Sequence, residues 1–448
     1  MASIFKAYDI RGIYGKELTE EVAYKIGRAF VTLVGCRKVV VARDIRPHSE
    51  PLFEALARGI CEQGADVVDI GYGSTPMSYF ANGTLGADGS IMITASHNPA
   101  PWNGFKLCRA GAEPISGDTG IKEIERMVLE DSYAPRAATP GNITQYDIQP
   151  EYTKHVAALA KLQRPVHLAI DFANGMGIWE NKALEGIITY DGLFGDPDGS
   201  FPNHEANPLN LETLKDLQQM VREGNYAFGV AYDGDADRAG FIDERGEIIP
   251  MDLTTALIAQ DVLATEKGAI FYDLRSSWVV KEVIQSAGGT PMMSRVGHAF
   301  IKAQMREHNA LFAGELSGHY YFKENFTAES SAMAVLALAN IVSKSNRPLS
   351  ELVAPLKKYF QSGEINSEVQ GDPQAILAQL KATYSKEGGR LLELDGVSVE
   401  FDDWWFNVRC SNTEPLVRLN LEAKTEARMV EKRDEILAVI RDSRKQLF

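Results

Sequence analysis

The chain has few cysteines, a shortage of positive charge and no long apolar run, and each shortage excludes a class of protein. Its 448 residues include only Cys36, Cys61, Cys108 and Cys410, without a CxxC pair, so neither a zinc site nor a disulfide framework is predicted. Lysine and arginine total 46 against 61 acidic residues, a net charge of -15. Because a phosphate backbone would repel this charge and no basic cluster offsets it, we expect no nucleic-acid partner.

The apolar segments are too short for a membrane or a secretory leader. Residues 332–342 are interrupted by Asn340 and fall short of the ~20 residues that span a bilayer, which favours a buried helix. The N-terminal stretch reaches Lys6, Asp9 and Arg11 before an apolar stretch of signal-peptide length can form. We therefore expect a cytoplasmic protein without a membrane partner.

What the chain does contain is typical of a globular α/β protein. Apolar residues make up 45% and charged residues 24% of the sequence, and the length predicts two to four domains at roughly 100 to 200 residues each. Short β-branched runs such as residues 39–41 and 67–70 alternate with helical patterns, one of which Ser49 is expected to cap. Such strands predict mainly parallel sheets whose ligands lie beyond the carboxyl ends of the strands.

Turn-rich stretches indicate where the chain divides. They lie at residues 135–150, 191–208 and 243–252, and after residue 361 the pattern changes to α+β. We expect four domains with the bounds 1–142, 143–245, 246–361 and 362–448.

The first chemically suggestive loop, residues 94–99, follows the strand 91–93. Its sequence, TASHNP, exposes the hydroxyl of Ser96 between polar neighbours, which makes this serine a candidate nucleophile. Serine, asparagine and proline are also ordinary turn residues, so a solvated turn is the alternative.

The second loop, residues 232–238, reads YDGDADR after the apolar strand 228–231. Asp233, Asp235 and Asp237 alternate with small residues, and oxygen ligands without histidine or cysteine favour Mg²⁺ or Ca²⁺. An EF-hand requires glycine where Arg238 stands and a preceding helix where a strand is predicted, so we favour magnesium.

Two more loops offer groups suited to a sugar phosphate. Residues 314–319, GELSGH, contain a carboxylate, a hydroxyl and an imidazole framed by glycines, and a polar strand-to-helix turn explains them equally well. Residues 409–415, RCSNTEP, combine a guanidinium with hydroxyls that can hold a phosphate, and the alternative is a plain hairpin turn.

These four loops in this order, together with AYDIRG at residues 7–12, resemble the α-D-phosphohexomutase superfamily, in particular its phosphomannomutase/phosphoglucomutase group. The resemblance covers essentially the whole chain. It implies three similar mixed or parallel-sheet α/β domains and a smaller C-terminal α+β domain around a central cleft. In that order, the domains would carry the phosphoserine loop, the metal-binding loop, the sugar-binding loop and the phosphate-binding loop.

The resemblance also implies a role for each loop. Ser96 would carry a phosphoryl group beside one Mg²⁺ held by Asp233, Asp235 and Asp237, and Arg238 would neutralise charge on the phosphate. Lys106 and His298 match positions of the general acid/base. The residues expected to bind substrate are Tyr8, Arg11, Glu315, Ser317, His319, Arg409, Ser411, Asn412 and Thr413.

The implied reaction is an isomerisation. Phosphoserine would give its group to mannose 1-phosphate or mannose 6-phosphate, form a hexose 1,6-bisphosphate, and recover a phosphate after the intermediate turns round, and the glucose phosphates would react similarly. A hexose 1,6-bisphosphate would serve as activator, and we expect a monomer or weak homodimer. The alternatives are a phosphoglucosamine mutase, a sugar phosphatase that uses Ser96 and magnesium, and a sugar-phosphate binder without activity.

Overall fold

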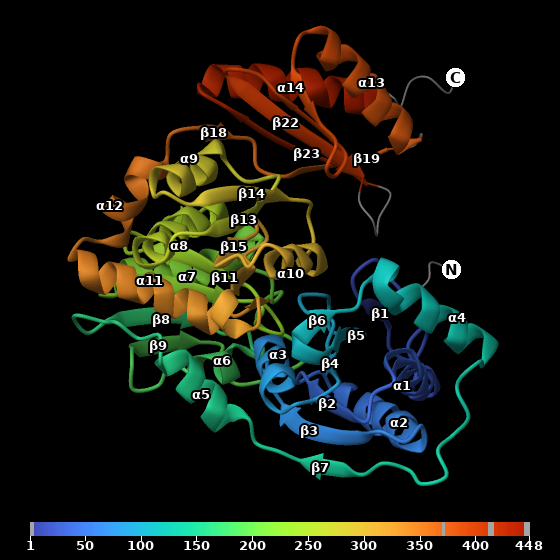
Figure 1. Cartoon of the computed structure of the whole chain (residues 1–448). Helices are drawn as coiled ribbons and strands as arrows, with labels where there is room; N and C mark the ends of the chain where they lie inside the picture. The colour runs from blue at the N-terminus through green and yellow to red at the C-terminus, as the bar shows by residue number, and fades with distance from the viewer. Residues whose placement is uncertain (1–3, 370–371, 411–415, 443–448) are drawn as a thin grey trace.

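The computed structural model describes residues 4–369, 372–410 and 416–442. Its strands form four sheets, each built from one continuous stretch of the chain (Figure 1). The first three sheets mix parallel and antiparallel pairs, and the fourth is antiparallel throughout. The predicted fold class is thus confirmed.

The first sheet has the strand order β1-β5-β4-β2-β3-β7, with β6 paired to β5. Strands β2, β3, β4 and β7 run parallel, whereas β1, β5 and β6 join through antiparallel pairs. The strand bounds are β1 Ile10–Ile13, β2 Lys38–Arg43, β3 Asp66–Tyr72, β4 Gly89–Ile93, β5 Trp102–Arg109, β6 Glu113–Pro114 and β7 Ile143–Gln145.

The second and third sheets repeat this pattern. Their strand orders are β9-β8-β10-β11-β12 and β14-β13-β15-β16-β17, and in each the first three strands are parallel and the last two antiparallel. The second contains β8 His167–Asp171, β9 Thr189–Leu193, β10 Phe228–Tyr232, β11 Ala239–Asp243 and β12 Ile248–Ile249. The third contains β13 Ala269–Asp273, β14 Thr290–Ser294, β15 Phe312–Gly314, β16 Tyr320–Phe322 and β17 Ala328–Glu329.

The fourth sheet has the order β18-β23-β22-β21-β20, with β19 also paired to β23. Its strands are β18 Phe360–Gln361, β19 Ile365–Glu368, β20 Arg390–Leu392, β21 Val397–Glu400, β22 Trp404–Cys410 and β23 Leu416–Ala423.

The helices form where apolar spacing and capping residues permit. Helix α1 begins after Thr19, whose hydroxyl accepts a hydrogen bond from the Val22 amide, and ends at Gly35, whose φ of 67° lies in the left-handed region. The helices are α1 Glu20–Val34, α2 Ser49–Glu62, α3 Thr75–Thr84, α4 Lys122–Glu130, α5 Gln149–Ala157, α6 Gly177–Lys182, α7 Lys215–Glu223, α8 Met251–Thr265, α9 Trp278–Ser286, α10 His298–Glu307, α11 Ser331–Ser345, α12 Leu349–Val353, α13 Pro373–Lys386 and α14 Glu426–Asp442.

Two helix predictions have opposite outcomes. The apolar segment 332–342 lies in α11 and is mostly buried, as its composition indicates. Ser49 does not cap α2: His48 is the N-cap residue, and the Ser49 hydroxyl donates to the Asp44 carboxylate over 2.5 Å. The Ser49 hydroxyl therefore bonds to the buried Asp44 carboxylate, whereas the local sequence predicts a bond to the backbone at the start of the helix.

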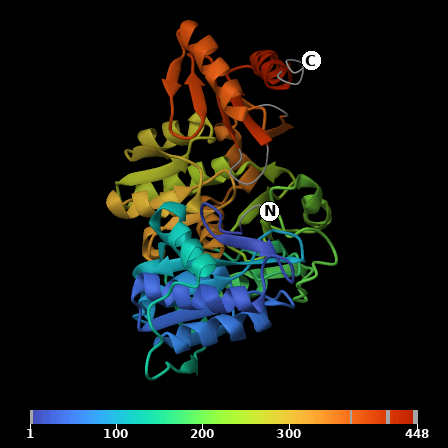
Figure 2. The same ribbon diagram turned by 90° about the vertical axis from the view of Figure 1, so that its right-hand side faces the viewer.

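The hydrophobic core joins the first three domains and leaves the fourth separate. One apolar cluster includes Val40, Leu168 and Phe312 from the first, second and third sheets, whereas the fourth sheet packs its own cluster around Trp404 and Phe406. Figure 2 shows the first domain, in blue, at the bottom and the fourth, in red, at the top.

We propose to place the domain boundaries by sheet membership, a few residues from the expected positions. Strand β7 extends the first sheet to Gln145, β12 extends the second to Ile249, and β18 joins the fourth sheet from Phe360.

The repeated topology places three of the candidate loops at equivalent positions. In each of the first three sheets, the third parallel strand (β4, β10 or β15) leads through a polar loop into an antiparallel strand (β5, β11 or β16). The serine loop (94–101), the aspartate loop (233–238) and the loop 315–319 are these three connections.

Candidate functional site

The serine loop presents a buried hydroxyl to the aspartate loop. Ser96 is 1% exposed, has a φ of 53°, and its Oγ donates to Asp233 Oδ2 over 2.8 Å. The His97 Nδ1 atom lies 3.1 Å from the same Oγ. A non-glycine residue in this strained region is frequent at functional sites, and here it directs the hydroxyl into the loop that follows β10.

The serine loop owes its shape to Arg46, a residue that the sequence analysis missed. One guanidinium nitrogen donates to the carbonyls of Ser96 (2.9 Å) and Asn98 (2.7 Å), and another donates to the Pro99 carbonyl (2.9 Å). The side chain is completely buried and pairs with Asp44. No linear motif indicates this function, because Arg46 lies 50 residues before Ser96.

The aspartate loop concentrates negative charge in the protein interior. Oxygen atoms of Asp233, Asp235 and Asp237 lie within 4.8 Å of one another, and all three residues are buried. Burial and the two neighbouring carboxylates raise the pKa of Asp233 to about 8. Burial also disfavours ionisation of Asp237, but Lys106, His319 and Arg238 outweigh it and hold its pKa well below the usual range.

Lys106 lies at the centre of this charge distribution. Its ammonium group donates to Asp235 over 2.6 Å and also to Asp237. Burial alone would lower the pKa of Lys106, but the two carboxylates raise it, so the side chain is an ammonium ion at neutral pH.

The aspartate loop fits a hard cation. Its donors are all carboxylate oxygens, and Asp235 Oδ1 is buried and lacks a hydrogen-bond partner among the described residues. The other oxygen of Asp235 accepts from the Thr75 hydroxyl over 2.5 Å, which fixes the orientation of the carboxylate. The cluster can therefore bind a metal ion.

The third loop contacts the second. His319 Nε2 lies 3.2 Å from Asp237 Oδ1, and its Nδ1 lies 2.9 Å from the Ser317 hydroxyl and 3.3 Å from Glu315. Burial opposes a charged imidazole, but Asp237 and Glu315 raise the pKa of His319 to about 9. Burial also opposes ionisation of Glu315, but His319 and Arg275 lower its pKa to about 2. In this loop the ionised Glu315 and His319 and the neutral Ser317 hydroxyl thus form one hydrogen-bonded network.

Arg238 and His298 add a cation and an imidazole near these loops. The Arg238 Nε atom lies 3.8 Å from Asp233 and 3.9 Å from Asp237. His298 begins α10, and burial together with the Lys302 and Lys106 cations lowers its pKa well below the usual value, so the imidazole is neutral.

The N-terminal segment approaches from the first domain. The Tyr8 hydroxyl donates to the Val296 carbonyl over 3.2 Å, and the Tyr8 ring centre lies 6.0 Å from that of His298. Arg11 donates to Asn98 Oδ1 over 2.6 Å, which links this segment to the serine loop.

The fourth domain contributes Arg409, at the end of β22. Ser411, Asn412 and Thr413, the other residues expected here, lie outside the described residues. The structure adds three charged neighbours that the sequence analysis missed: Arg275 after β13, Glu364 before β19 and Arg418 on β23. Arg275 stands two residues after β13, just as the chosen loops follow their strands.

Residues of all four domains line one cavity of about 240 Å³. It brings together most of the predicted side chains. Ser96, Asp233 and Asp235 are buried and do not line it, but they contact or approach its lining residues His97, Lys106 and Asp237. The charged and polar lining residues are Tyr8, Asp9, Arg11, His97, Lys106, Asp237, Arg238, Arg275, His298, Glu315, Ser317, His319, Glu364, Arg409 and Arg418.

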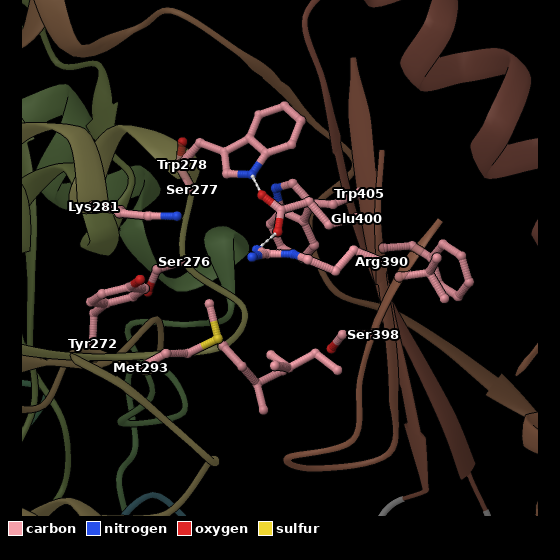
Figure 3. Close-up of a pocket in the computed structure, with 14 residues that line it drawn as sticks. Tyr272, Ser276, Ser277, Trp278, Lys281, Met293, Arg390, Ser398, Glu400 and Trp405 are labelled. Carbon is pink, nitrogen blue, oxygen red and sulfur yellow. Dashed lines mark hydrogen bonds and ion pairs between the residues drawn. The ribbon is translucent and has the colours of Figure 1, made fainter. Parts of the chain in front are cut away.

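A second, smaller cavity of about 50 Å³ lies between the third and fourth domains (Figure 3). Its aromatic lining residues are Tyr272 and Trp278 of the third domain and Trp405 and Phe406 of the fourth. Trp278 Nε1 donates to Glu400 over 2.8 Å, and Arg390 pairs with the same carboxylate. These contacts hold α9 against the fourth sheet, so this cavity belongs to the domain junction.

Family models match the chain in four parts. They are described as phosphoglucomutase/phosphomannomutase alpha/beta/alpha domain I (residues 2–134), domain II (150–246) and domain III (250–359), and as the C-terminal domain of the same family (364–439).

Individual relatives are similar to this chain over nearly their whole length. The chain is 40% identical to a phosphomannomutase of Escherichia coli (98% of this chain, 99% of the relative) and 41% identical to one of Methanocaldococcus jannaschii (98% and 97%). A crystal structure of a phosphoglucomutase/phosphomannomutase family protein from Burkholderia thailandensis matches with a TM-score of 0.91 at 33% identity, covering 100% of this chain and 99% of that one. Within the described residues, no helix is both long enough and apolar enough to cross a bilayer.

Proposed function

The chain belongs to the phosphoglucomutase/phosphomannomutase family of isomerases, and we propose that it interconverts mannose 1-phosphate and mannose 6-phosphate, and also the glucose phosphates, through a phosphoserine at Ser96. One observation carries this proposal: the Ser96 hydroxyl lies 2.8 Å from Asp233 of the buried aspartate cluster, and Asp237 of the same cluster lines a cavity to which all four domains contribute. This arrangement supports a phosphoryl carrier next to a cation site and close to a polar binding cavity.

Asp233, Asp235 and Asp237 would hold one Mg²⁺ together with Ser96. When bound, the ion neutralises charge on the phosphoryl oxygens and orients them for in-line transfer. Arg238 supports the same role from the protein, since its guanidinium lies just beyond Asp233 and Asp237 and faces the cavity.

Proton transfer at the attacking sugar oxygen falls to His298 or Lys106. His298 is neutral and lines the cavity, so it can accept a proton from a sugar hydroxyl. Lys106 is held as an ammonium ion by two carboxylates, which suits it to stabilising negative charge and to donating a proton to the leaving oxygen.

The remaining predicted residues would bind substrate. Glu315, Ser317 and His319 offer a carboxylate, a hydroxyl and a charged imidazole that can hold sugar hydroxyls in either orientation of the bisphosphate. Arg409, with Ser411, Asn412 and Thr413, would hold the phosphate that is not transferred. Tyr8 and Arg11 would close the cavity from the first domain.

The partners follow from this chemistry. Hexose phosphates are the substrates, and a hexose 1,6-bisphosphate is the activator because it rephosphorylates Ser96. The expected monomer or weak homodimer and the cytoplasmic location stay predictions.

Turnover of mannose 1-phosphate, glucose 1-phosphate and glucosamine 1-phosphate, measured side by side with Mg²⁺ and a trace of hexose bisphosphate, tests the proposal. We expect the 6-phosphates of mannose and glucose to form without free phosphate. Free phosphate would indicate a phosphatase, and a preference for the glucosamine substrate would indicate a phosphoglucosamine mutase.

A further inference from the structure

A carboxylate lies among the guanidinium groups of the cavity. Glu364 Oε2 accepts hydrogen bonds from Arg409 (2.9 Å) and Arg275 (3.3 Å), and its Oε1 lies 3.5 Å from Arg418. The Asn420 amide donates to Oε2 over 3.3 Å. Burial disfavours the charge of Glu364, but the three arginines lower the pKa of this carboxyl group to about 2, so it is ionised at neutral pH.

The contacts of Glu364 join two domains. Arg409 and Arg418 are paired neighbours on β22 and β23 of the fourth sheet, whereas Arg275 follows β13 of the third. Arg275 also pairs with Asp273 over 2.7 Å within its own domain. Glu364 is therefore the acidic group through which the fourth domain reaches the cation of the third.

The carboxylate occupies the same guanidinium donors that a phosphate would use. All three arginines and Glu364 line the cavity, and Arg409 and Arg275 are almost fully buried, where charge interactions are screened little. A bound phosphate must share or displace the hydrogen bonds that the arginines donate to Glu364, which weakens the binding of the phosphate.

This weakening matters because of the proposed function, on which the inference rests. The bisphosphate has to leave the arginines, turn round and bind them again through its other phosphate. Without the Glu364 carboxylate, the almost fully buried guanidinium groups of Arg275 and Arg409 would hold each phosphate more tightly and slow that exchange.

We propose that Glu364 is a positioning residue that competes with phosphate: its carboxylate keeps Arg275, Arg409 and Arg418 assembled and weakens their hold on the phosphate group that is not transferred. Its side chain thus lowers the affinity for the bound sugar phosphate and raises the rate of turnover.

Glu364→Gln tests this proposal because it keeps the size of the side chain and removes the charge. Mannose 1-phosphate is titrated calorimetrically into Ser96→Ala and into Ser96→Ala with Glu364→Gln, at low and high salt. We expect about tenfold tighter binding in the glutamine variant, with a difference that largely persists at high salt because buried charges are screened little. With Ser96 intact, Glu364→Gln should lower both KM and kcat.

Glu431→Gln is the matched control, since it makes the same charge change on the exposed surface of α14, where Glu431 pairs with Arg428. If the Glu364 carboxylate only aligned the arginines, removing its charge would leave the affinity for mannose 1-phosphate equal or lower. Equal or weaker binding by the Glu364 variant would therefore overturn the inference. Absence of binding in the Ser96→Ala protein itself would instead contradict the proposed function.

Discussion

The buried aspartates place three carboxylates in one small volume, and the described cations Lys106, Arg238 and His319 surround them. Unpaired buried charge is costly, so such a cluster persists where a cation or a reaction requires it. Charge interactions therefore determine the arrangement of these side chains at neutral pH, and the site is suited to binding charged ligands.

Asp235→Asn removes one carboxylate from this cluster with little change in shape. Because Asp235 Oδ1 has no described hydrogen-bond partner, we expect the loss to appear mainly in metal binding, with at least a tenfold higher Mg²⁺ concentration for half-maximal activity. Activity of chelator-treated protein during Mg²⁺ titration measures this shift. Asp216→Asn, on the exposed face of α7, is the control, and an unchanged Mg²⁺ requirement in the Asp235 variant would exclude this carboxylate as a ligand.

Candidate functional residues could be predicted from the sequence where they lie in a loop that follows an apolar strand. Ser96 and the three aspartates stand in the loops that follow the apolar strands β4 and β10, and the composition of these loops suggests their chemistry. Arg46 and Glu364 have no such signal. The role of each depends on a contact with a distant part of the chain. Arg46 contacts the serine loop, and Glu364 contacts Arg275.

At the scale of elements, the serine loop and the aspartate loop are fitted to each other. A Cβ atom on Gly234 would lie 2.4 Å from the Ser96 carbonyl oxygen, so only glycine allows this approach. Apolar patterns predict strands such as β2, β3, β4 and β10 and the buried helix α11. This contact and the failure of Ser49 to cap α2 depend instead on partners distant in sequence.

Arg46→Lys should loosen the serine loop without unfolding the first domain. A lysine ammonium cannot reproduce the planar guanidinium that holds the Ser96, Asn98 and Pro99 carbonyls. We expect kcat to fall about a hundredfold while KM changes little, because the loop carries the reacting hydroxyl. Arg37→Lys, at an exposed position, serves as the control, and steady-state kinetics that match the natural protein would contradict this role for Arg46.

At the scale of the whole molecule, three domains meet at Glu180 of α6. Its carboxylate accepts from Ser74 of the first domain, from Tyr152 of the second, and from Ser331 of the third. Sequence predicts the division into α/β domains because their strands alternate with helices, but it contains no local record of such contacts between domains.

This junction should make stability depend on pH. Burial raises the pKa of Glu180 from 4.5 to about 7, although its hydrogen bonds oppose the rise. A folded-state pKa above the unfolded value gives stability that is present below about pH 4.5 and lost as pH rises through about 7, by about 3 kcal/mol.

Glu180→Gln removes that titration. Thermal unfolding across this pH range should show a falling Tm in the natural protein, and the variant should lose less stability over the same interval. Glu54→Gln, exposed on α2, should behave like the natural protein. Parallel pH profiles for Glu180→Gln and the natural protein would show that Glu180 does not titrate there.

Phosphoryl transfer through Ser96 is the central claim, and isomerisation by Ser96→Ala tests it most directly. Mannose 1-phosphate is supplied with Mg²⁺ and a trace of hexose 1,6-bisphosphate, and mannose 6-phosphate and free phosphate are measured. We predict that the natural protein forms the 6-phosphate without releasing phosphate, and that Ser96→Ala binds the sugar phosphate but forms no product. Normal isomerisation by Ser96→Ala would contradict the account.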